Sequence, residues 1–205
     1  TVGDQTFGDT VTALSSITLN AGTGDISIED VDNDLQGTVS VNGRNVTIFD
    51  AGDLDLGAST VTGSLNVSAD GDITDSGTLT VSGEGIFETF DDSGANITLN
   101  DASSTFGTIT AQASNGAGNV TSDGDIQITE NADLTIDTID TLGDVTLTSA
   151  GAIIDGDDTF DDISADAVVL SAVNGIGNTD ALETAINSIQ ASTTNGNISL
   201  TNDVS

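Results

Sequence analysis

The chemistry open to this chain rests almost entirely on carboxylates. Its 205 residues include 34 Asp and Glu but one basic residue, Arg44, and no His or Cys. The densest acidic stretches are DVDND, from Asp30 to Asp34, and DGDDTFDD, from Asp155 to Asp162. Carboxylate oxygens are the ligands that Ca²⁺ prefers, and two paired carboxylic acids can hydrolyse a glycosidic bond. Cation binding and sugar hydrolysis are therefore the two kinds of chemistry to consider.

The first stretch is close to a calcium-binding loop. Asp30, Asp32 and Asp34 stand at positions one, three and five of an EF-hand. The sixth position is Leu35 in place of Gly, and the twelfth is Val41 in place of Glu. The second stretch has no known ligand spacing, and the nonapeptide pattern of calcium-binding β-rolls is absent. We therefore expect hydrated surface turns with no defined metal site and no cofactor, and only weak Ca²⁺ association.

The pattern for sugar hydrolysis is also incomplete. Asp161 and Asp162 form a pair in FDD, and NTD, which ends at Asp180, is similar to a motif of the polygalacturonase-like hydrolases. Those enzymes also carry a His-containing motif and a basic motif, and lyases need a basic residue to accept a proton. With no His, and with Arg44 as its only basic residue, the chain has no base near these acids in sequence, and with no Trp or Tyr it has no stacking platform for sugars. We expect no enzymatic activity and assign the six Phe to the core. They are Phe7, Phe49, Phe87, Phe90, Phe106 and Phe160.

Composition excludes further function classes. A net charge of −33 rules out the phosphate neutralisation on which DNA and RNA binding depends. No apolar run is long enough to cross a membrane as a helix, so membrane insertion is not expected. The acidic surface favours solubility in salt and suggests a saline habitat. Because the chain begins at Thr1 with neither Met nor a signal peptide, we expect a piece of a longer chain or a processed end.

Short strands are predicted along the whole chain. Apolar residues alternate with polar ones over three to five positions, and Gly, Asp, Asn and Ser separate these runs. The gaps alternate between about 8 and about 20 residues, which is typical of a solenoid with about ten coils of roughly 20 residues. The apolar triplets begin at Ile26, Val39, Val46, Leu54, Leu65, Leu79, Ile97, Ile126, Leu134, Val145 and Ile198.

An internal repeat of 80 residues also indicates a solenoid. Residues 17–77 match residues 97–157, and ITLN occurs at the start of both. Between residues 45 and 75 no gap is needed, whereas residues 21–44 match only with insertions at turns, as a repeat array tolerates. We therefore treat residues 1–205 as one solenoid segment. The paired apolar positions, all expected to face inward, are Val46/Ile126, Ile48/Ile128, Leu54/Leu134, Leu56/Ile136, Leu65/Val145, Val67/Leu147 and Ile73/Ile153.

Other folds fit less well. A pair of β-sandwich domains would be expected to carry a core Trp, a corner Tyr and linker Pro, all of which are absent. No strict six-residue register supports a hexapeptide helix. The stretch TDALETAINSIQA stays open between two interpretations. It has helical spacing at Leu182, Ala185, Ile186 and Ile189, but it also reads as a strand that continues the solenoid.

The residues also carry a family resemblance. GSLNVSADGDITDSGTLTVSG, ANITLNDASSTFGT and NVTIFDAGDLDLGAST resemble the repeats of filamentous-haemagglutinin-like adhesins and related giant bacterial surface exoproteins. The resemblance covers roughly residues 10–205. It implies a right-handed parallel β-helix and export to the cell surface. It also implies a structural or adhesive role, with neighbouring repeats and a host, cell-surface or matrix ligand as partners. The secretion-signal domain of that family is not in this sequence.

The sequence therefore predicts an all-β, right-handed parallel β-helix that acts as an extracellular rod segment. Two alternatives are a calcium-binding repeat module and an ice-binding solenoid. Flat rows of Thr can order water, but the spacings between the Thr pairs here share no single coil length. Thr is also a common residue on the exposed face of a strand. The pairs are Thr10–Thr12, Thr78–Thr80, Thr108–Thr110 and Thr146–Thr148.

Overall fold

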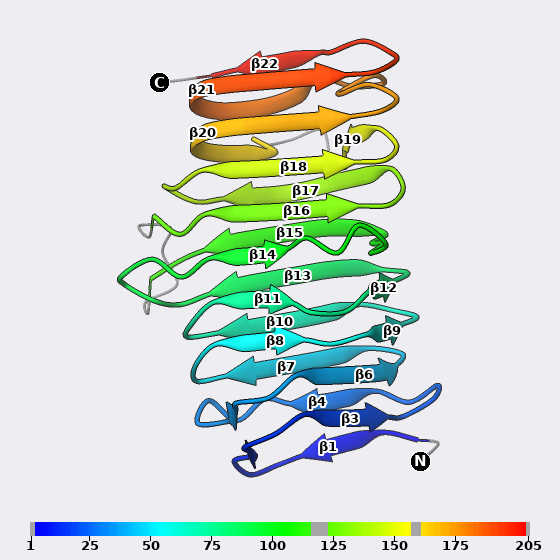
Figure 1. Ribbon diagram of the computed structural model, residues 1–205, viewed down its shortest axis with the longest axis vertical. Helices are drawn as coiled ribbons and strands as arrows, with labels where there is room; N and C mark the ends of the chain where they lie inside the picture. The colour runs from blue at the N-terminus through cyan, green and yellow to red at the C-terminus, as the bar shows by residue number, and fades with distance from the viewer. Residues whose placement is uncertain (1–2, 116–122, 157–160, 204–205) are drawn as a thin grey trace.

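The chain forms a β-solenoid. The computed structural model describes residues 3–115, 123–156 and 161–203, and these residues contain no helix, so none that could cross a membrane. About nine turns of about 21 residues stack along the long axis, with the two termini at opposite ends (Figure 1). The strands pair in parallel from one turn to the next. The predicted all-β solenoid is thus confirmed, with about nine turns in place of about ten.

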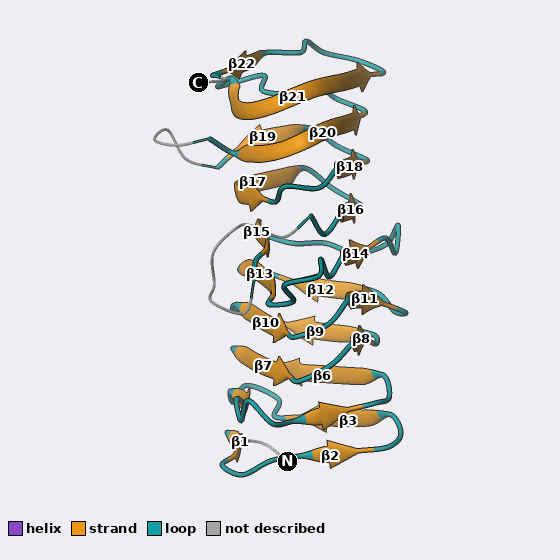
Figure 2. Cartoon of the chain, turned by 90° about the vertical axis from the view of Figure 1, so that its left-hand side faces the viewer, coloured by secondary structure: helices purple, strands orange, loops and turns teal. Residues whose placement is uncertain are grey.

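Three ladders of stacked strands, here called walls A, B and C, surround the core, and each turn passes through them in that order (Figure 2). Wall A contains β1 (Gln5–Phe7), β4 (Ile26–Ile28), β7 (Val46–Asp50), β10 (Leu65–Ala69), β13 (Glu84–Thr89), β15 (Thr108–Ala113), the end of β17 (Leu134–Asp140), the starts of β20 (Ile163–Ala172) and β21 (Leu182–Thr193), and β22 (Leu200–Asn202).

The other two walls are built from shorter strands. Wall B contains β8 (Leu54–Leu56), β11 (Ile73–Asp75), β14 (Ile97–Leu99), β16 (Ile126–Glu130), β18 (Val145–Ser149) and the ends of β20 and β21. Wall C contains β3 (Ile17–Asn20), β6 (Val39–Gly43), β9 (Ser59–Val61), β12 (Leu79–Val81) and, by their place in the turn, the start of β17 and β19 (Ile153–Asp155). A separate short ladder joins β2 (Thr12–Ala13) to β5 (Asp34–Leu35).

The alternation of the sequence explains why these strands form. Successive side chains of a strand point to opposite faces, so every second residue enters the core. Leu54, Ile73 and Leu79 are fully buried, and so are the other side chains that stack above and below them. All fourteen residues of the seven predicted pairs are buried, at no more than 1% exposure. The inward orientation predicted for these residues is therefore confirmed.

The meaning of the 80-residue repeat changes, however. Val46 stacks in wall A on Leu65, and that ladder continues through Gly85 and Ile109 to Ile136. Ile126, its partner in the sequence match, lies in wall B instead, stacked on Ile97. The 80-residue match therefore aligns a strand–corner–strand unit on one pair of walls with a similar unit on a different pair of walls. It does not superimpose whole turns of the solenoid. Corner residues such as Asp53/Asp133, Gly63/Gly143 and Gly71/Gly151 coincide in the match, although they join different walls.

Two other interpretations are settled by the strands. The stretch TDALETAINSIQA from Leu182 onward belongs to β21, a twelve-residue strand that pairs with β20 over most of its length. The helical alternative is wrong because Val168, Leu170 and Ala172 offer this segment an in-register parallel partner. The two-sandwich alternative is wrong as well, since the strands of residues 3–115, 123–156 and 161–203 pair in parallel.

The phenylalanines divide between the core and the outer surface. Phe87 is fully buried and meets Phe106 edge to face, with ring centroids 5.9 Å apart. Phe7 is half-buried and packs against the core at the first turn. Phe49 and Phe90 instead occupy outward positions, where their half-buried rings stack at 6.3 Å. The core assignment is thus wrong for this last pair, and Phe160 lies outside the described residues.

Candidate functional site

Many of the acids are part of the framework. Asp53, Asp72, Asn96, Asp125 and Asp144 each precede the first inward residue of a wall B strand, and we call this column the Asx ladder. The Oδ1 atom of each residue accepts a hydrogen bond from the backbone N–H at the same position in the next turn. The five bonds run from Asp72 to Asp53 (3.0 Å), Asn96 to Asp72 (2.7 Å), Asp125 to Asn96 (2.8 Å), Asp144 to Asp125 (2.9 Å) and Ala167 to Asp144 (3.2 Å).

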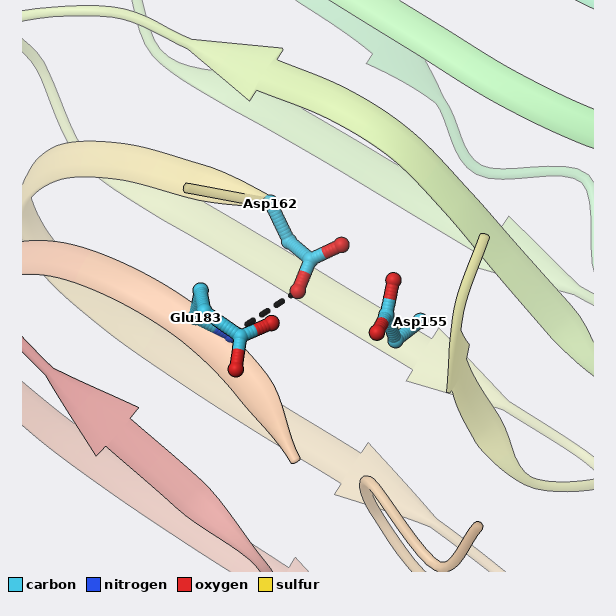
Figure 3. A group of neighbouring side chains, drawn as sticks. All are labelled: Asp155, Asp162 and Glu183. Carbon is cyan, nitrogen blue, oxygen red and sulfur yellow. Dashed lines mark hydrogen bonds between the residues drawn. The ribbon is translucent and has the colours of Figure 1, made fainter. Parts of the chain in front are cut away.

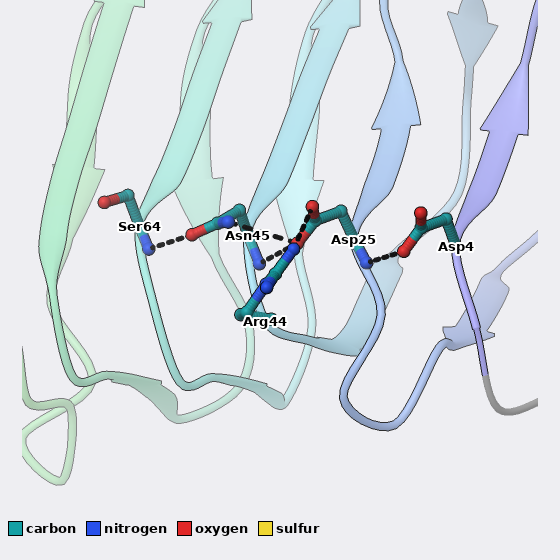
Figure 4. A network of polar contacts seen from close by, with 5 residues as sticks. All are labelled: Asp4, Asp25, Arg44, Asn45 and Ser64. Carbon is teal, nitrogen blue, oxygen red and sulfur yellow. Dashed lines mark hydrogen bonds and ion pairs between the residues drawn. The ribbon is translucent and has the colours of Figure 1, made fainter.

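A shorter column at another corner contains the single basic residue (Figure 4). Asp25 donates its N–H to Asp4, and Asn45 donates its own to Asp25. Arg44 forms two hydrogen bonds to the Asp25 carboxylate, at 2.9 and 2.7 Å. These bonds, with that from the Asn45 backbone, lower the pKa of Asp25 to about 2. Arg44 is therefore already paired and is far in sequence from the acidic stretch that begins at Asp155.

The DVDND loop does not converge on a common point. Asp30 accepts hydrogen bonds from the Thr10 hydroxyl and from the N–H of Asp32, which makes it a turn residue. Asp34 accepts a bond from the amide of Gln36 at the start of β5. In the described part of the chain these carboxylates belong to no cluster of potential ligands.

Three carboxylates do converge, at the corner between walls C and A (Figure 3). Asp155 ends β19, Asp162 immediately precedes β20, and Glu183 is the second residue of β21 in the next turn. Each offers a carboxylate oxygen, and these oxygens all lie within 4.8 Å of one another. We call these three residues the acidic cluster. Its donor set consists of oxygen alone, which suits a hard cation.

Asp162 is the buried member of the acidic cluster. Its residue exposure is 1%, whereas Asp155 and Glu183 are half-buried. One of its oxygens, Oδ2, accepts the N–H of Glu183 at 2.8 Å, and the other, Oδ1, has no hydrogen-bond partner. Burial raises the pKa of Asp162 well above its ordinary value, and the negative charges of Asp155 and Glu183 raise it further. Asp162 therefore keeps one buried oxygen without a hydrogen-bond partner beside two further carboxylates.

A second buried acid stands alone. Glu130 ends β16 and is 1% exposed. Its Oε2 accepts the N–H of Phe106 at 3.0 Å, and its Oε1 has no partner. Ser149 fills the same position in the next turn, and its hydroxyl bonds to the corner carbonyls of Ala132 and Ala152. Glu130 is thus a corner residue that points inward, and burial raises its pKa to about 7.

The other predicted site residues do not come together. Asp180 accepts the N–H of Ala181 and lies on the surface, as does Asp161. The middle of DGDDTFDD, residues 157–160, lies outside the described residues. Of the described residues in this stretch, Asp155 and Asp162 meet in the acidic cluster. The threonine pairs spread over all three walls. Thr80 lies in wall C, Thr108 and Thr110 in wall A, and Thr146 and Thr148 in wall B.

Sequence reasoning missed two features of this site. It did not include Glu183, because that residue reaches the cluster from the next turn and no local spacing links it to Asp155. It also treated the turn acids as surface charge and missed the Asx ladder. The signal for the ladder was present, since Asp or Asn stands directly before the apolar strand residue in GDL, GDI, ANI, GDI and GDV, with ANI at Ala95–Ile97 and GDV at Gly143–Val145.

Comparison with known proteins gives one match. A family described as repeats of unknown function (DUF5649) matches residues 3–42 and 43–113, which together make up more than half of the chain. The boundary between the two matches falls at the end of β6, where wall C turns into wall A. No curated protein and no solved structure matches the chain.

Proposed function

Because this chain belongs to a family of repeats of unknown function, DUF5649, we propose a role from its architecture: it is a structural rod segment of a long bacterial surface protein. Backbone hydrogen bonds between turns run along the axis, so each added turn lengthens the rod without new topology. At about 4.8 Å per turn, nine turns span about 43 Å. The proposed task is extension, with the chain holding more distant parts of the same protein away from the cell.

The observation that carries this proposal is the uncovered core at both ends of the stack. Ile189 and Ile198 stack on the buried Val168 and Ile176 and face inward, yet they are 44% and 43% exposed. At the first turn, Phe7 is likewise only half-buried against the core. Further turns of the same shape would cover these side chains, and repeat arrays otherwise need polar caps. Both ends of the described stack thus leave inward-facing side chains on which turns can be added, which favours a rod.

The charge of the outer surface supports the same role. Parallel strands at the end of a stack present unpaired N–H and C=O groups that can join those of another copy. A net charge of −33 makes neighbouring copies repel one another and favours solubility at high salt. An acid-coated rod on a cell surface in a saline habitat is consistent with this composition.

Tandem duplication tests the rod. The chain and a head-to-tail fusion of two copies, joined in register, are compared by small-angle X-ray scattering in 0.5 M NaCl. The root-mean-square end-to-end distance of the fusion, derived from its radius of gyration, should be close to twice that of the single copy. A freely jointed connection would increase it only by about the square root of two. Growth by that smaller factor would show that the turns of the two copies do not stack, and it would overturn the proposed extension.

Surface location needs a separate test. An antibody against the chain should label intact cells of the organism that produces it, and an antibody against a cytoplasmic protein serves as the negative control. Labelling that appears only after permeabilisation would exclude the surface role. If the cells are labelled and beads coated with the chain also bind to host cells or matrix, the segment is adhesive itself, and the pure spacer role is wrong.

A further inference from the structure

The acidic cluster differs from the other groups of acids in the described part of the chain. In the Asx ladder, each carboxylate accepts one backbone N–H from the next turn. Here three carboxylates from the end of β19, the residue before β20 and the next turn meet within 4.8 Å, and one of them is 99% buried. The Asp162 oxygen that does not bond to the backbone lies on the side of Asp155 (Figure 3).

That oxygen requires a positively charged or hydrogen-bonding partner. A buried carboxylate oxygen without one loses its hydration, and two further carboxylates beside it add repulsion. The chain contains no Lys or His, and its one Arg is paired with Asp25. No basic side chain is therefore available to compensate the site, and a proton or a cation from solution must do so.

Glu130 is a buried carboxylate that does not belong to a cluster, and it serves as a comparison for Asp162. It is equally buried and also has one oxygen without a partner, but it forms no group of converging carboxylates. A lone buried carboxylate can be neutralised by a proton, whereas a single proton leaves most of the charge of a triad in place. The arrangement around Asp162 thus favours a multivalent cation, which the arrangement around Glu130 does not.

We propose that Asp155, Asp162 and Glu183 bind one Ca²⁺ ion. Asp162 supplies Oδ1, and the other two residues supply one oxygen each. Because Asp155 and Glu183 are half-exposed, water completes the coordination. Three oxygens that all lie within 4.8 Å of one another can reach a single ion. Ca²⁺ accepts oxygen ligands in a flexible geometry, whereas Mg²⁺ demands near-ideal octahedral geometry and gives up its water reluctantly, so carboxylates held by separate strands suit Ca²⁺ better.

Such an ion would join two turns of the solenoid. Asp155 and Asp162 stand at the two ends of the connection between β19 and β20, and Glu183 belongs to the next turn. The ion would therefore join Asp155 and Asp162 to β21 at the corner between walls C and A. The inference concerns a local site and is independent of the proposed role as a rod.

Calorimetric titration of the whole chain with CaCl₂ tests this assignment. The protein is first stripped with chelator, and 0.15 M NaCl screens diffuse attraction to the acidic surface. We expect one ion per chain with a Kd on the order of 10⁻⁴ M, and at least tenfold weaker binding of Mg²⁺. Asp162→Asn and Glu183→Gln should each weaken Ca²⁺ binding at least tenfold. Asp32→Asn, which removes one exposed charge, should leave it within twofold.

Several outcomes would overturn the site. Equal weakening by all three substitutions would mean that Ca²⁺ only condenses on the acidic surface. Tighter binding of Mg²⁺ than of Ca²⁺ would contradict the choice of ion. Thermal melts in chelator, followed by circular dichroism, check that each variant folds. Under these conditions Asp162→Asn should have a melting temperature equal to or higher than that of the parent. If Asp162→Asn does not fold, Glu183→Gln and Asp155→Asn, both at half-buried positions, decide the question on their own.

Discussion

Glu130 should make the solenoid less stable as the pH rises. Its carboxyl group is 1% exposed at the end of β16, and burial raises its pKa from 4.5 to about 7. In the unfolded chain this group loses its proton near pH 4.5, while the folded chain retains it until about pH 7. Between these values the unfolded state binds fewer protons, so the free energy of unfolding falls as the pH rises and then levels off above pH 7.

The size of the effect follows from the shift. A pKa raised from 4.5 to about 7 corresponds to about 3 kcal/mol in full, most of which develops between pH 5 and pH 8. Glu130→Gln removes the titrating group while keeping an oxygen that can accept the N–H of Phe106. The variant should therefore lose about 2–3 kcal/mol less than the parent between these two pH values.

Urea unfolding followed by far-UV circular dichroism measures this difference, since the chain has no Trp or Tyr for fluorescence. Parent, Glu130→Gln and the exposed control Glu29→Gln are compared at pH 5 and pH 8 in 0.5 M NaCl with chelator present. Only the difference between variants matters, because the other acids titrate in all three proteins. If Glu130→Gln and the parent lose the same stability within about 0.5 kcal/mol, the reasoning from burial is refuted.

Three further predictions test the framework. The melting temperature should rise between 0.01 and 1 M NaCl, because the screening length falls from about 30 Å to about 3 Å and the repulsion among the 34 carboxylates weakens. KCl at the same concentration should have the same effect, and a melting temperature that does not change with salt would contradict this prediction. Gly107→Ala should lower the free energy of unfolding by about 2 kcal/mol, because its Cβ would lie 2.6 Å from the carbonyl oxygen of Ser82. The control Gly52→Ala, whose Cβ would meet nothing within 4 Å, should be nearly neutral in the same urea assay. Asn33→Ala should lower the free energy of unfolding by about 2–3 kcal/mol, because the buried amide bonds to Val11, Ile28 and Phe49, and a loss below about 0.5 kcal/mol would show that these bonds contribute little.

The strands were predictable because alternation is a local property. Ile26–Ile28, Leu54–Leu56 and Leu79–Val81 were each predicted as apolar triplets, and each forms a strand with those bounds. The assignment of strands to walls was not predictable in the same way. Corners look alike in sequence whether they join walls A and B or walls B and C, so Val46 was matched with Ile126 although the two lie on different walls. Only the backbone pairing between turns distinguishes them.

The acidic cluster shows a second limit of prediction from the sequence. Spacing along the chain drew attention to the acids between Asp155 and Asp162, but it gave no reason to add Glu183. The distance in sequence between stacked residues varies from turn to turn, as the step from Leu65 to Gly85 and the longer step from Gly85 to Ile109 show. A convergence of residues from two turns therefore cannot be derived from a fixed period, although the separate residues are visible in the sequence.

The Asx ladder bears on why the chain is so acidic. Its positions need a short side chain with an acceptor oxygen for the N–H of the next turn, which Lys and Arg cannot provide. Asn96 meets this need as Asp72 and Asp125 do, with a bond of 2.8 Å to the next N–H. The bond therefore explains why the residue is Asp or Asn, but not why it is Asp at four of the five positions. The preference for the charged form must come either from the greater strength of a charge-assisted bond or from the charge of the surface as a whole. Salt separates these explanations, since screening weakens the repulsion of the whole surface but leaves short bonds at the corners largely intact.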